Sequence, residues 1–362
     1  MASHLIRGSG PLLDDRGHLR EPGYALTPPF SYDRSQVRAA TWRIKEWDYY
    51  LVNDDRFALA LTFSDLGYMG LVSASVMDFS AGTFKTTSDL VVMPLGRMGL
   101  PPSSEKGDIT WENARCRVSF AHVPGGRRLS FAMRGFDEGY GAAPAGDLEA
   151  EVLLFDEPRD SMVIATPWAE DSRAFYFNRK VIGMRARGAM RRGGLFHEFS
   201  PEKDADGGAS FGLLDWGRGV WTYDNVWYWA AAQGLQRGPD GEDHVVGLNL
   251  GYGFGETTAA SENMAFVDGV AHKLDRVGFG IPASADGTYR YLEPWHLTDS
   301  EGRLDLTFSP QIDRTDVIDF KLLCSRQHQV FGTLDGTVTL DDGSVLAIEG
   351  LRGSAEHIHN RY

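Results

Sequence analysis

Cysteine is nearly absent from the chain. Among 362 residues only Cys116 and Cys324 occur, far apart in sequence and without CxxC or Cys/His ligand spacing. This excludes a disulfide framework and gives no indication of a zinc site. The composition fits a reducing compartment, so we predict a cytoplasmic location.

Long apolar segments are also missing. No run approaches the roughly 20 apolar residues that a membrane-spanning helix needs, and the N-terminal residues contain no apolar signal core. We therefore expect a soluble, unsecreted protein without integral membrane insertion.

Basic residues are in the minority. The chain has 36 Lys and Arg against 50 Asp and Glu, a formal net charge of −14. Binding to nucleic acid or to an anionic membrane needs a dense basic surface. The one locally basic stretch, residues 185–192, is too short to reverse the balance, so we predict no nucleic-acid partner.

Several catalytic signatures do not occur in the sequence. It has no GxSxG elbow, no P-loop GxxxxGK[ST] and no HExxH pair. The sequence therefore gives no sign of these chemistries.

Strand-forming alternation is what the chain does have. Short alternating runs recur between turn residues, accompanied by 42 glycines and 20 phenylalanines. No stretch shows sustained helical periodicity, although residues 42–50 could form a short helix. We predict an all-β fold, with first-half strands at residues 49–53, 56–64, 68–78, 84–92, 109–111, 116–122, 128–134 and 148–155.

The two halves have similar length and strand rhythm. Residues 1–36 are rich in glycine, proline and charge, which predicts an extended N-terminal arm. The segment Pro167 to Arg173 interrupts the pattern before strands resume. We predict one antiparallel barrel or sandwich in residues 37–174 and a second, beside it, in residues 175–362.

Asp-Gly dipeptides predict the turns of the second half. Asp268-Gly269 lies between two apolar arms, and a type I′ turn needs positive φ at both central residues. Three further pairs, at residues 286–287, 335–336 and 342–343, predict additional turns. Residues 327–351 would then form a meander of about three strands.

Tryptophan and tyrosine concentrate between residues 215 and 229. If residues 226–229 form a strand, Trp227 and Trp229 point to one face and Val226 and Tyr228 to the other. Clustered indoles suit a cavity that holds an apolar ligand, and an aromatic core is the alternative. We predict ligand contacts for Trp216, Trp221, Tyr223 and Trp227.

Arg218 lies between two glycines and three residues from Asp215. It could contact a substrate, or it could form a structural ion pair with Asp215 that closes a turn, since buried charges generally need partners. Both interpretations stay open.

A run of alternating glycines surrounds Asn249. Residues 247, 251, 253 and 255 are glycines that share its predicted face, while Tyr252 and Phe254 share the opposite face. A glycine face lets a ligand or another backbone approach closely, so Asn249 and Tyr252 are candidate ligand contacts. A dinucleotide fingerprint is rejected because the spacing is not GxGxxG and no helix follows.

The Asp268-Gly269 hairpin places Ala265 opposite His272 and Asn263 opposite Leu274. Asn263 and His272 would be diagonal neighbours on one face, able to act as a general acid or base with its orienting group. A hydrogen-bonded structural pair is the alternative. Glu262 would point to the other face.

Ionisable residues gather at the C-terminal end, in residues 355–362. In a strand, His357 and His359 share a face and Glu356 points the other way. A metal site needs a third protein ligand, and none has recognisable spacing. We therefore interpret Glu356 as a pocket carboxylate.

The same motifs resemble a bacterial family, the domain of unknown function 2804. The resemblance covers about residues 40–362 and is most specific in the segments 215–221, 227–230, 249–255, 262–263, 268–274, 328–332 and 356–362. More distantly, the layout is similar to the lipocalin-type double barrels of carotenoid 1,2-hydratases and related fungal hydratases and Diels–Alderases. That similarity implies a calycin-like fold and an apolar isoprenoid or polyketide substrate, without metal or organic cofactor.

Three functions remain open on the sequence alone. The first is a cofactor-independent hydratase, isomerase or cyclase in which a carboxylic acid protonates an alkene and aromatic rings stabilise the cation. The second is a non-catalytic carrier of a lipid or pigment, and the third is carbohydrate binding or cleavage. The candidate catalytic residues are Glu262, His272, Asp215 and Glu356, and the candidate ligand contacts are Trp216, Arg218, Trp221, Tyr223, Trp227, Asn249, Tyr252 and Asn263.

Overall fold

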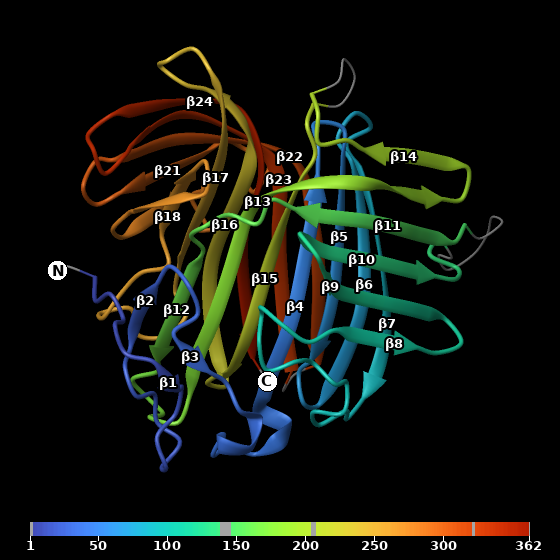
Figure 1. Cartoon of the computed structure of the whole chain (residues 1–362), viewed down its shortest axis with the longest axis vertical. Coiled ribbons are helices and arrows are strands. Elements are labelled where there is room, and N and C mark those ends of the chain that lie inside the picture. Colours follow the sequence, from blue (N-terminus) through green and yellow to red (C-terminus); the bar gives the residue numbers. More distant parts are fainter. Residues whose placement is uncertain (1–2, 138–145, 204–207, 321–322, 362) are drawn as a thin grey trace. The chain divides into compact units, whose positions relative to one another are not determined.

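The computed structural model describes residues 3–137, 146–203, 208–320 and 323–361 (Figure 1). Within these residues the regular elements are β-strands and two single 3₁₀ turns, η1 at Arg34–Gln36 and η2 at Thr41–Arg43. The all-β prediction is confirmed. None of the helical segments described is long and apolar enough to cross a membrane.

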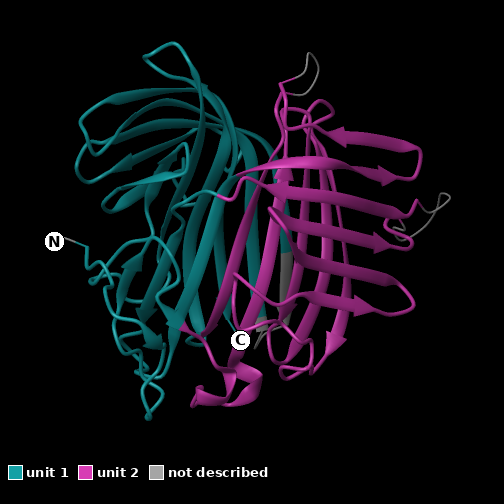
Figure 2. Cartoon of the chain, in the orientation of Figure 1, with its two compact units in different colours: residues 1–30, 158–183, 220–362 teal, residues 31–157, 184–219 magenta. Residues whose placement is uncertain are grey.

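The chain forms two compact units, both discontinuous in sequence (Figure 2). Unit 1 comprises Met1–Phe30, Pro158–Gly183 and Val220–Tyr362, and unit 2 comprises Ser31–Glu157 and Met184–Gly219. The predicted division at residues 36 and 174 concerns domains and stays a prediction.

Unit 2 contains most of a thirteen-stranded sheet. Its strand order is β7-β6-β5-β4-β15-β13-β11-β10-β9-β8, with β2 (Gly23–Ala25), β12 (Met162–Pro167) and β14 attached to the side of this path. The chain passes from unit 1 to unit 2 within β13. The strands are β4 Ile44–Asn53, β5 Phe57–Asp65, β6 Met69–Asp78, β7 Thr83–Val92, β8 Ile109–Glu112, β9 Cys116–Val123, β10 Gly126–Met133, β11 Leu148–Phe155, β13 Phe175–Arg192, β14 Leu195–Phe199 and β15 Phe211–Val220.

The eight strands predicted in the first half all form, with ends shifted by a few residues. The short helix considered at residues 42–50 is wrong, because only Thr41–Arg43 makes a helical turn and β4 begins at Ile44. Nine of the ten residues of β4 are buried, and that burial on both faces outweighs local propensity.

Unit 1 holds a curled nine-stranded sheet in which every adjacent pair of strands is antiparallel (Figure 1). Its order is β19-β18-β17-β16-β24-β23-β22-β21-β20. These strands are β16 Asp224–Arg237, β17 Asp243–Tyr252, β18 Met264–Val267, β19 Val270–Lys273, β20 Val277–Gly280, β21 Trp295–Asp299, β22 Leu304–Phe320, β23 Leu323–Thr339 and β24 Val345–Arg361.

Earlier segments complete unit 1. They are β1 Gly10–Pro11, β2 Gly23–Ala25, β12 Met162–Pro167 and the first part of β13. A further short strand, β3 at Phe30–Ser31, begins at the last residue of its first segment. The pairing of β12 with both β2 and residues 175–180 ties the N-terminal segment to the rest of the unit.

One face of the nine-stranded sheet carries the apolar core of unit 1. Its fully buried members include Leu250 on β17, Trp295 on β21, Phe308 on β22 and Val330 on β23. Burying such side chains supplies the main favourable term for folding.

The turn predictions have mixed outcomes. Asp268-Gly269 forms the hairpin turn with positive φ at both residues, and Val267 pairs with Val270 as expected. The turns at residues 286–287 and 342–343 also form. The prediction at Asp335-Gly336 is wrong, because both residues lie inside β23, so residues 327–351 contain two strands rather than three.

Candidate functional site

The register across β17, β16, β24 and β23 creates two neighbouring rows of side chains on opposite faces of the sheet. Trp229 lies opposite Gly251 on one side and Glu356 on the other, and Glu356 lies opposite Gln329. We call the face of this row the acid face. One residue along each strand, the second row consists of Tyr252, Tyr228, His357 and His328. The alternation predicted for residues 226–229 and for residues 356–359 is confirmed.

Glu356 is a buried carboxylate on the acid face, with 8% of its surface exposed. Its Oε1 accepts a 3.2 Å hydrogen bond from the indole Nε1 of Trp227, and its Oε2 accepts a 3.1 Å bond from the amide Nε2 of Gln329. These two bonds hold the carboxylate in a fixed orientation.

Aromatic rings gather beside this carboxylate. The ring of Phe254 lies 4.9 Å from Trp227 and 5.0 Å from Trp221, and the two indoles are 5.8 Å apart. Phe254 was predicted to share the face of Tyr252, which is wrong. β17 ends at Tyr252, and the positive φ of Gly253 turns the chain so that Phe254 packs on the acid face.

Glu262 and Asn249 position the second indole. The Oδ1 of Asn249 accepts a 2.8 Å bond from Trp229 Nε1, and its Nδ2 donates to the Glu262 carbonyl at 2.8 Å and to Glu262 Oε2 at 3.3 Å. A Cβ on Gly251 would lie 2.6 Å from Glu262 Oε1, so the bare glycine makes room for this carboxylate. The glycine face thus admits a side chain of the same chain.

The first part of β13 adds a cation to the acid face. Lys180 Nζ lies 4.4 Å from the centroid of the Trp229 ring and donates to the hydroxyl of Tyr176 at 3.4 Å. The Tyr176 ring in turn lies 4.2 Å from Phe254. The acid face therefore combines two carboxylates, one ammonium group and several large rings in a buried setting.

The opposite row forms a stacked cluster of tyrosines and histidines. Tyr228 stacks on Tyr252 and on His357, both at 4.4 Å between centroids, and Tyr291 stacks on His328 at 3.8 Å. A 2.8 Å hydrogen bond joins the Tyr291 hydroxyl to His357 Nδ1.

Burial shifts the pKa values in this cluster. It lowers the pKa of His357 to about 4, assisted by the nearby charges of His328 and His359, and raises the pKa of Tyr291 to about 12. At neutral pH the cluster is therefore uncharged at both groups. Tyr252, predicted as a ligand contact, belongs to this packed cluster.

Asn263 and His272 form hydrogen bonds with different partners. Asn263 accepts a 2.6 Å bond from Gly251 N and donates to the Asp275 carbonyl at 2.7 Å, whereas His272 Nδ1 accepts a 3.2 Å bond from Asp341 N. The predicted pairing of Ala265 with His272 is confirmed. Each of the two side chains fixes its own loop or strand.

In unit 2, Arg218 is fully buried and its ion-pair partner is Asp48 at 3.0 Å, where Asp215 had been considered. It also donates to the carbonyls of Trp47 and Pro101, and its guanidinium lies 4.3 Å from the Trp216 ring centroid. Residues 47 and 101 are remote in sequence from Arg218, so no local pattern could reveal these partners. Asp215, 8% exposed, and Trp216 are buried in the same unit.

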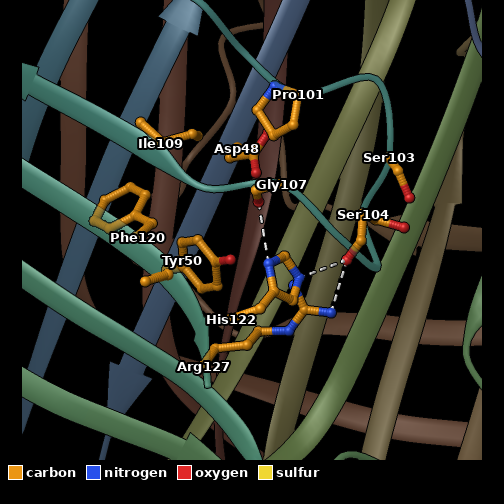
Figure 3. A pocket seen from close by; sticks show the side chains of 11 residues that line it. Asp48, Tyr50, Pro101, Ser103, Ser104, Gly107, Ile109, Phe120, His122 and Arg127 are labelled. Atoms are coloured by element: carbon orange, nitrogen blue, oxygen red, sulfur yellow. Dashed lines mark hydrogen bonds between the residues drawn. The ribbon is translucent and has the colours of Figure 1, made fainter. Parts of the chain in front are cut away.

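A small pocket in unit 2 lies next to this ion pair (Figure 3). Asp48 lines it together with Tyr50, His122 and Arg127. Arg127 donates to the Ser104 carbonyl at 2.8 Å and to His122 Nε2 at 3.0 Å, and it forms a 3.0 Å ion pair with Glu157.

His122 Nδ1 donates to the Gly107 carbonyl at 3.0 Å. The polar groups of the pocket thus bind one another and fasten residues 101–107 to the sheet, as Figure 3 shows for His122 and Arg127. Its enclosed part has room for roughly one water molecule. We interpret this pocket as structural.

Two predicted site residues lie in other surroundings, and several unpredicted ones join the acid face. Tyr223 is 52% exposed, and His272 accepts a hydrogen bond from the backbone N–H of Asp341. Gln329 and Lys180 contact the acid face although sequence reasoning gave them no role. The only signal for Gln329 was its place in the segment 328–332, which carried the family resemblance. No group of three or more His, Cys, Asp or Glu side chains suited to a metal ion occurs in the described part of the chain.

Comparisons with known proteins give weak structural likenesses. A putative AttH, NE1406, from Nitrosomonas europaea has 12% identity, with 93% of this chain and 98% of that chain covered and a TM-score of 0.48. Kievitone hydratase from Nectria haematococca has 11% identity, 88% coverage of each chain and a TM-score of 0.44. CghA with Sch210972 has 13% identity, 97% coverage of each chain and a TM-score of 0.47.

At these values none of the three assigns an activity to this chain. No curated protein matches the sequence. One family model does match, over residues 3–362. The chain therefore belongs to the family described as Domain of unknown function (DUF2804).

Proposed function

We propose that the protein is a cofactor-independent enzyme of the hydratase, isomerase or cyclase type, acting on an unsaturated apolar small molecule at the acid face of unit 1. One observation carries the proposal. The buried carboxyl group of Glu356 accepts hydrogen bonds from Trp227 and Gln329 beside the rings of Trp221, Trp227 and Phe254.

The chemistry that this arrangement supports begins with proton transfer from Glu356 to a substrate double bond. The resulting carbocation would be stabilised by the faces of the neighbouring indole rings. It then loses a proton, adds water or is attacked by a second double bond, which gives isomerisation, hydration or cyclisation. In each case the proton released returns to the Glu356 carboxylate, so no other reactant is consumed except water in hydration.

Glu356 is a better candidate for the acid than Glu262. Glu262 shares Asn249 with the Trp229 indole and fills the space over Gly251, so its contacts support the ring system. We therefore assign Glu262 to positioning. Asp215 belongs to unit 2, and His272 Nδ1 accepts a hydrogen bond from Asp341 N, so neither residue belongs to the row of Glu356.

The test incubates the purified protein with a cell lipid extract and identifies by mass spectrometry which compounds are retained and which are converted. We expect Glu356→Gln to retain the ligand but lose conversion by at least about a hundredfold, the usual scale for a general acid. Trp227→Ala should weaken both. Glu349→Gln, an exposed carboxylate on the same strand, is the matched control and should behave as wild type.

Other outcomes would support a different function or a different catalytic residue. Retention without conversion by the wild type would indicate a lipid or pigment carrier. Conversion that survives in Glu356→Gln would exclude this residue as the acid. If the wild type retains no apolar compound at all, the result would favour the carbohydrate hypothesis.

A further inference from the structure

We propose that the ligand of the acid face is an elongated apolar molecule with a hydroxyl group at each end. This inference rests on the proposed function, because it assumes that the ligand binds at the acid face. It goes further by naming the class of substrate. It is carried by three buried amide oxygens, those of Gln329, Asn225 and Asn360.

These three side chains are 3%, 8% and 5% exposed, respectively. Within the described part of the chain, Gln329 Oε1, Asn225 Oδ1 and Asn360 Oδ1 have no hydrogen-bond partner. A buried acceptor without a donor costs free energy, so each one calls for a bound group that donates to it.

The orientation of two of the amides follows from their nitrogens. Gln329 Nε2 donates to Glu356 Oε2 at 3.1 Å, and Asn225 Nδ2 donates to the Thr222 carbonyl at 2.8 Å. Rotating either amide by half a turn would bring oxygen against oxygen. The carbonyl oxygens of both residues therefore point away from these partners and stay available to a donor.

All three amides lie on the acid face, in two groups. Asn225 on β16 pairs directly with Asn360 on β24, and Gln329 on β23 pairs directly with Glu356 on β24. Residues 356 and 360 are four positions apart on one strand and so share a face, with about 13 Å between their Cα atoms.

The row between the two groups is largely apolar on the central strands. It contains Trp227 and, paired with it, Ile358. The Trp221 ring packs beside Trp227. A ligand that reaches both groups of acceptors must therefore place an apolar middle on these side chains.

Neutral hydroxyl groups fit the two ends best. Amide oxygens only accept, so the ligand must donate. A ligand carboxylate has only acceptor atoms and could not donate to these oxygens. One hydroxyl would donate to Gln329 near the proposed acid, and the other would donate to Asn225 or Asn360.

The test measures binding alone, so it does not depend on turnover. Straight-chain α,ω-diols from hexanediol to dodecanediol are titrated into the full chain by calorimetry, and each is compared with the primary alcohol of the same length. We expect the diols to bind about fivefold more tightly than the alcohols, with an optimum at the length that spans both groups.

Substitutions of the two asparagines test whether the preference for diols arises at these residues. Asn360→Leu and Asn225→Leu should each reduce or abolish the advantage of the diol while leaving the alcohol bound, and either variant suffices if the other fails to fold. His359→Gln is the control, because this neighbour of Asn360 points to the opposite face and bonds Asp224.

The outcomes separate this inference from the proposed function. Alcohols that bind as tightly as diols would overturn the inference, since the orphan oxygens would then be served by water, and the proposed acid chemistry would stand. If neither probe binds, the inference is overturned together with the location of the ligand. A diol preference that persists in both asparagine variants would also overturn it.

Discussion

Glu356 and His357 are neighbours in sequence, but their side chains lie on opposite faces of the sheet. Glu356 lies buried among indoles, and His357, its neighbour, stacks on Tyr228 on the other face. Strand alternation predicts this separation because successive side chains point to opposite faces. It does not predict Gln329 or Tyr291, which reach the two residues only through the pairing of β23 with β24 and through the fold of residues 281–294.

The shifted pKa of His357 predicts a pH dependence of stability. Because burial lowers this pKa from 6.5 to about 4, the unfolded chain binds a proton in that interval that the folded chain does not. The stability contributed by neutral His357 is complete above about pH 6.5 and is lost as the pH falls towards 4. Urea unfolding at a series of pH values should show this loss in wild type, and a reduced loss in His357→Gln.

His244 supplies the control with the opposite sign. Its hydrogen bonds to Asp268 and then to Asp240 raise its pKa to about 9, so its contribution is present below about pH 6.5 and is lost as the pH rises through 9. The variant His244→Gln should alter only the alkaline side of the stability profile. An unchanged acidic side in His357→Gln would contradict the role given to His357.

At the scale of elements, strands and tight hairpins follow from local pattern, whereas bulges do not. Asp268-Gly269 forms the predicted turn with φ of 48° and 76°. Asp335-Gly336 is the same dipeptide, yet β23 continues through it, with an irregular register next to Gly336. A Cβ on Gly336 would lie closer to the carbonyl oxygen of Asp305 in β22 than van der Waals contact allows. A glycine needed for close approach of a partner strand thus resembles a turn glycine until the partner is known.

The glycine face of β17 gives a prediction at this scale. Gly251→Ala would force the Glu262 carboxylate away from its place beside Asn249, because the new Cβ would lie 2.6 Å from Glu262 Oε1. We expect a loss of about 1–3 kcal/mol in the free energy of unfolding, the usual cost of overpacking. Chemical denaturation measures it.

Gly278→Ala in β20 is the matched control for Gly251→Ala. A Cβ at Gly278 meets nothing within 4 Å, so this substitution should leave the stability close to that of wild type. Equal effects of the two substitutions would mean that the space over Gly251 is not specifically occupied.

At the scale of the whole molecule, the interleaving of the two units is the feature that the sequence concealed. The interruption of the strand pattern at Pro167 to Arg173 favoured a boundary near residue 174, which stays a prediction. Unit 1 gathers three separate segments of the chain. The chain passes between the units inside β13, a continuous strand whose residues 175–183 belong to unit 1 and whose remaining residues belong to unit 2. The alternating sequence pattern of a strand does not change at such a point. The compact units become visible only when long-range pairing is known.

The fragment 175–362 tests that organisation. It lacks residues 158–174, which include β12, the strand paired with residues 175–180, and Asp160, whose carboxylate accepts a hydrogen bond from Ala271 N. We expect the isolated fragment to unfold without cooperativity and to show poor dispersion of its amide resonances. A cooperative transition like that of the full chain would instead support an independent domain beginning near residue 175.

The central claim, that Glu356 delivers a proton to carbon, is tested most directly by running the lipid conversion in D₂O and measuring deuterium in the product. For wild type we predict one carbon-bound deuterium from solvent, with product formation abolished in Glu356→Gln and retained in Glu349→Gln. A product without carbon-bound deuterium, or equal incorporation by Glu356→Gln, would contradict the account.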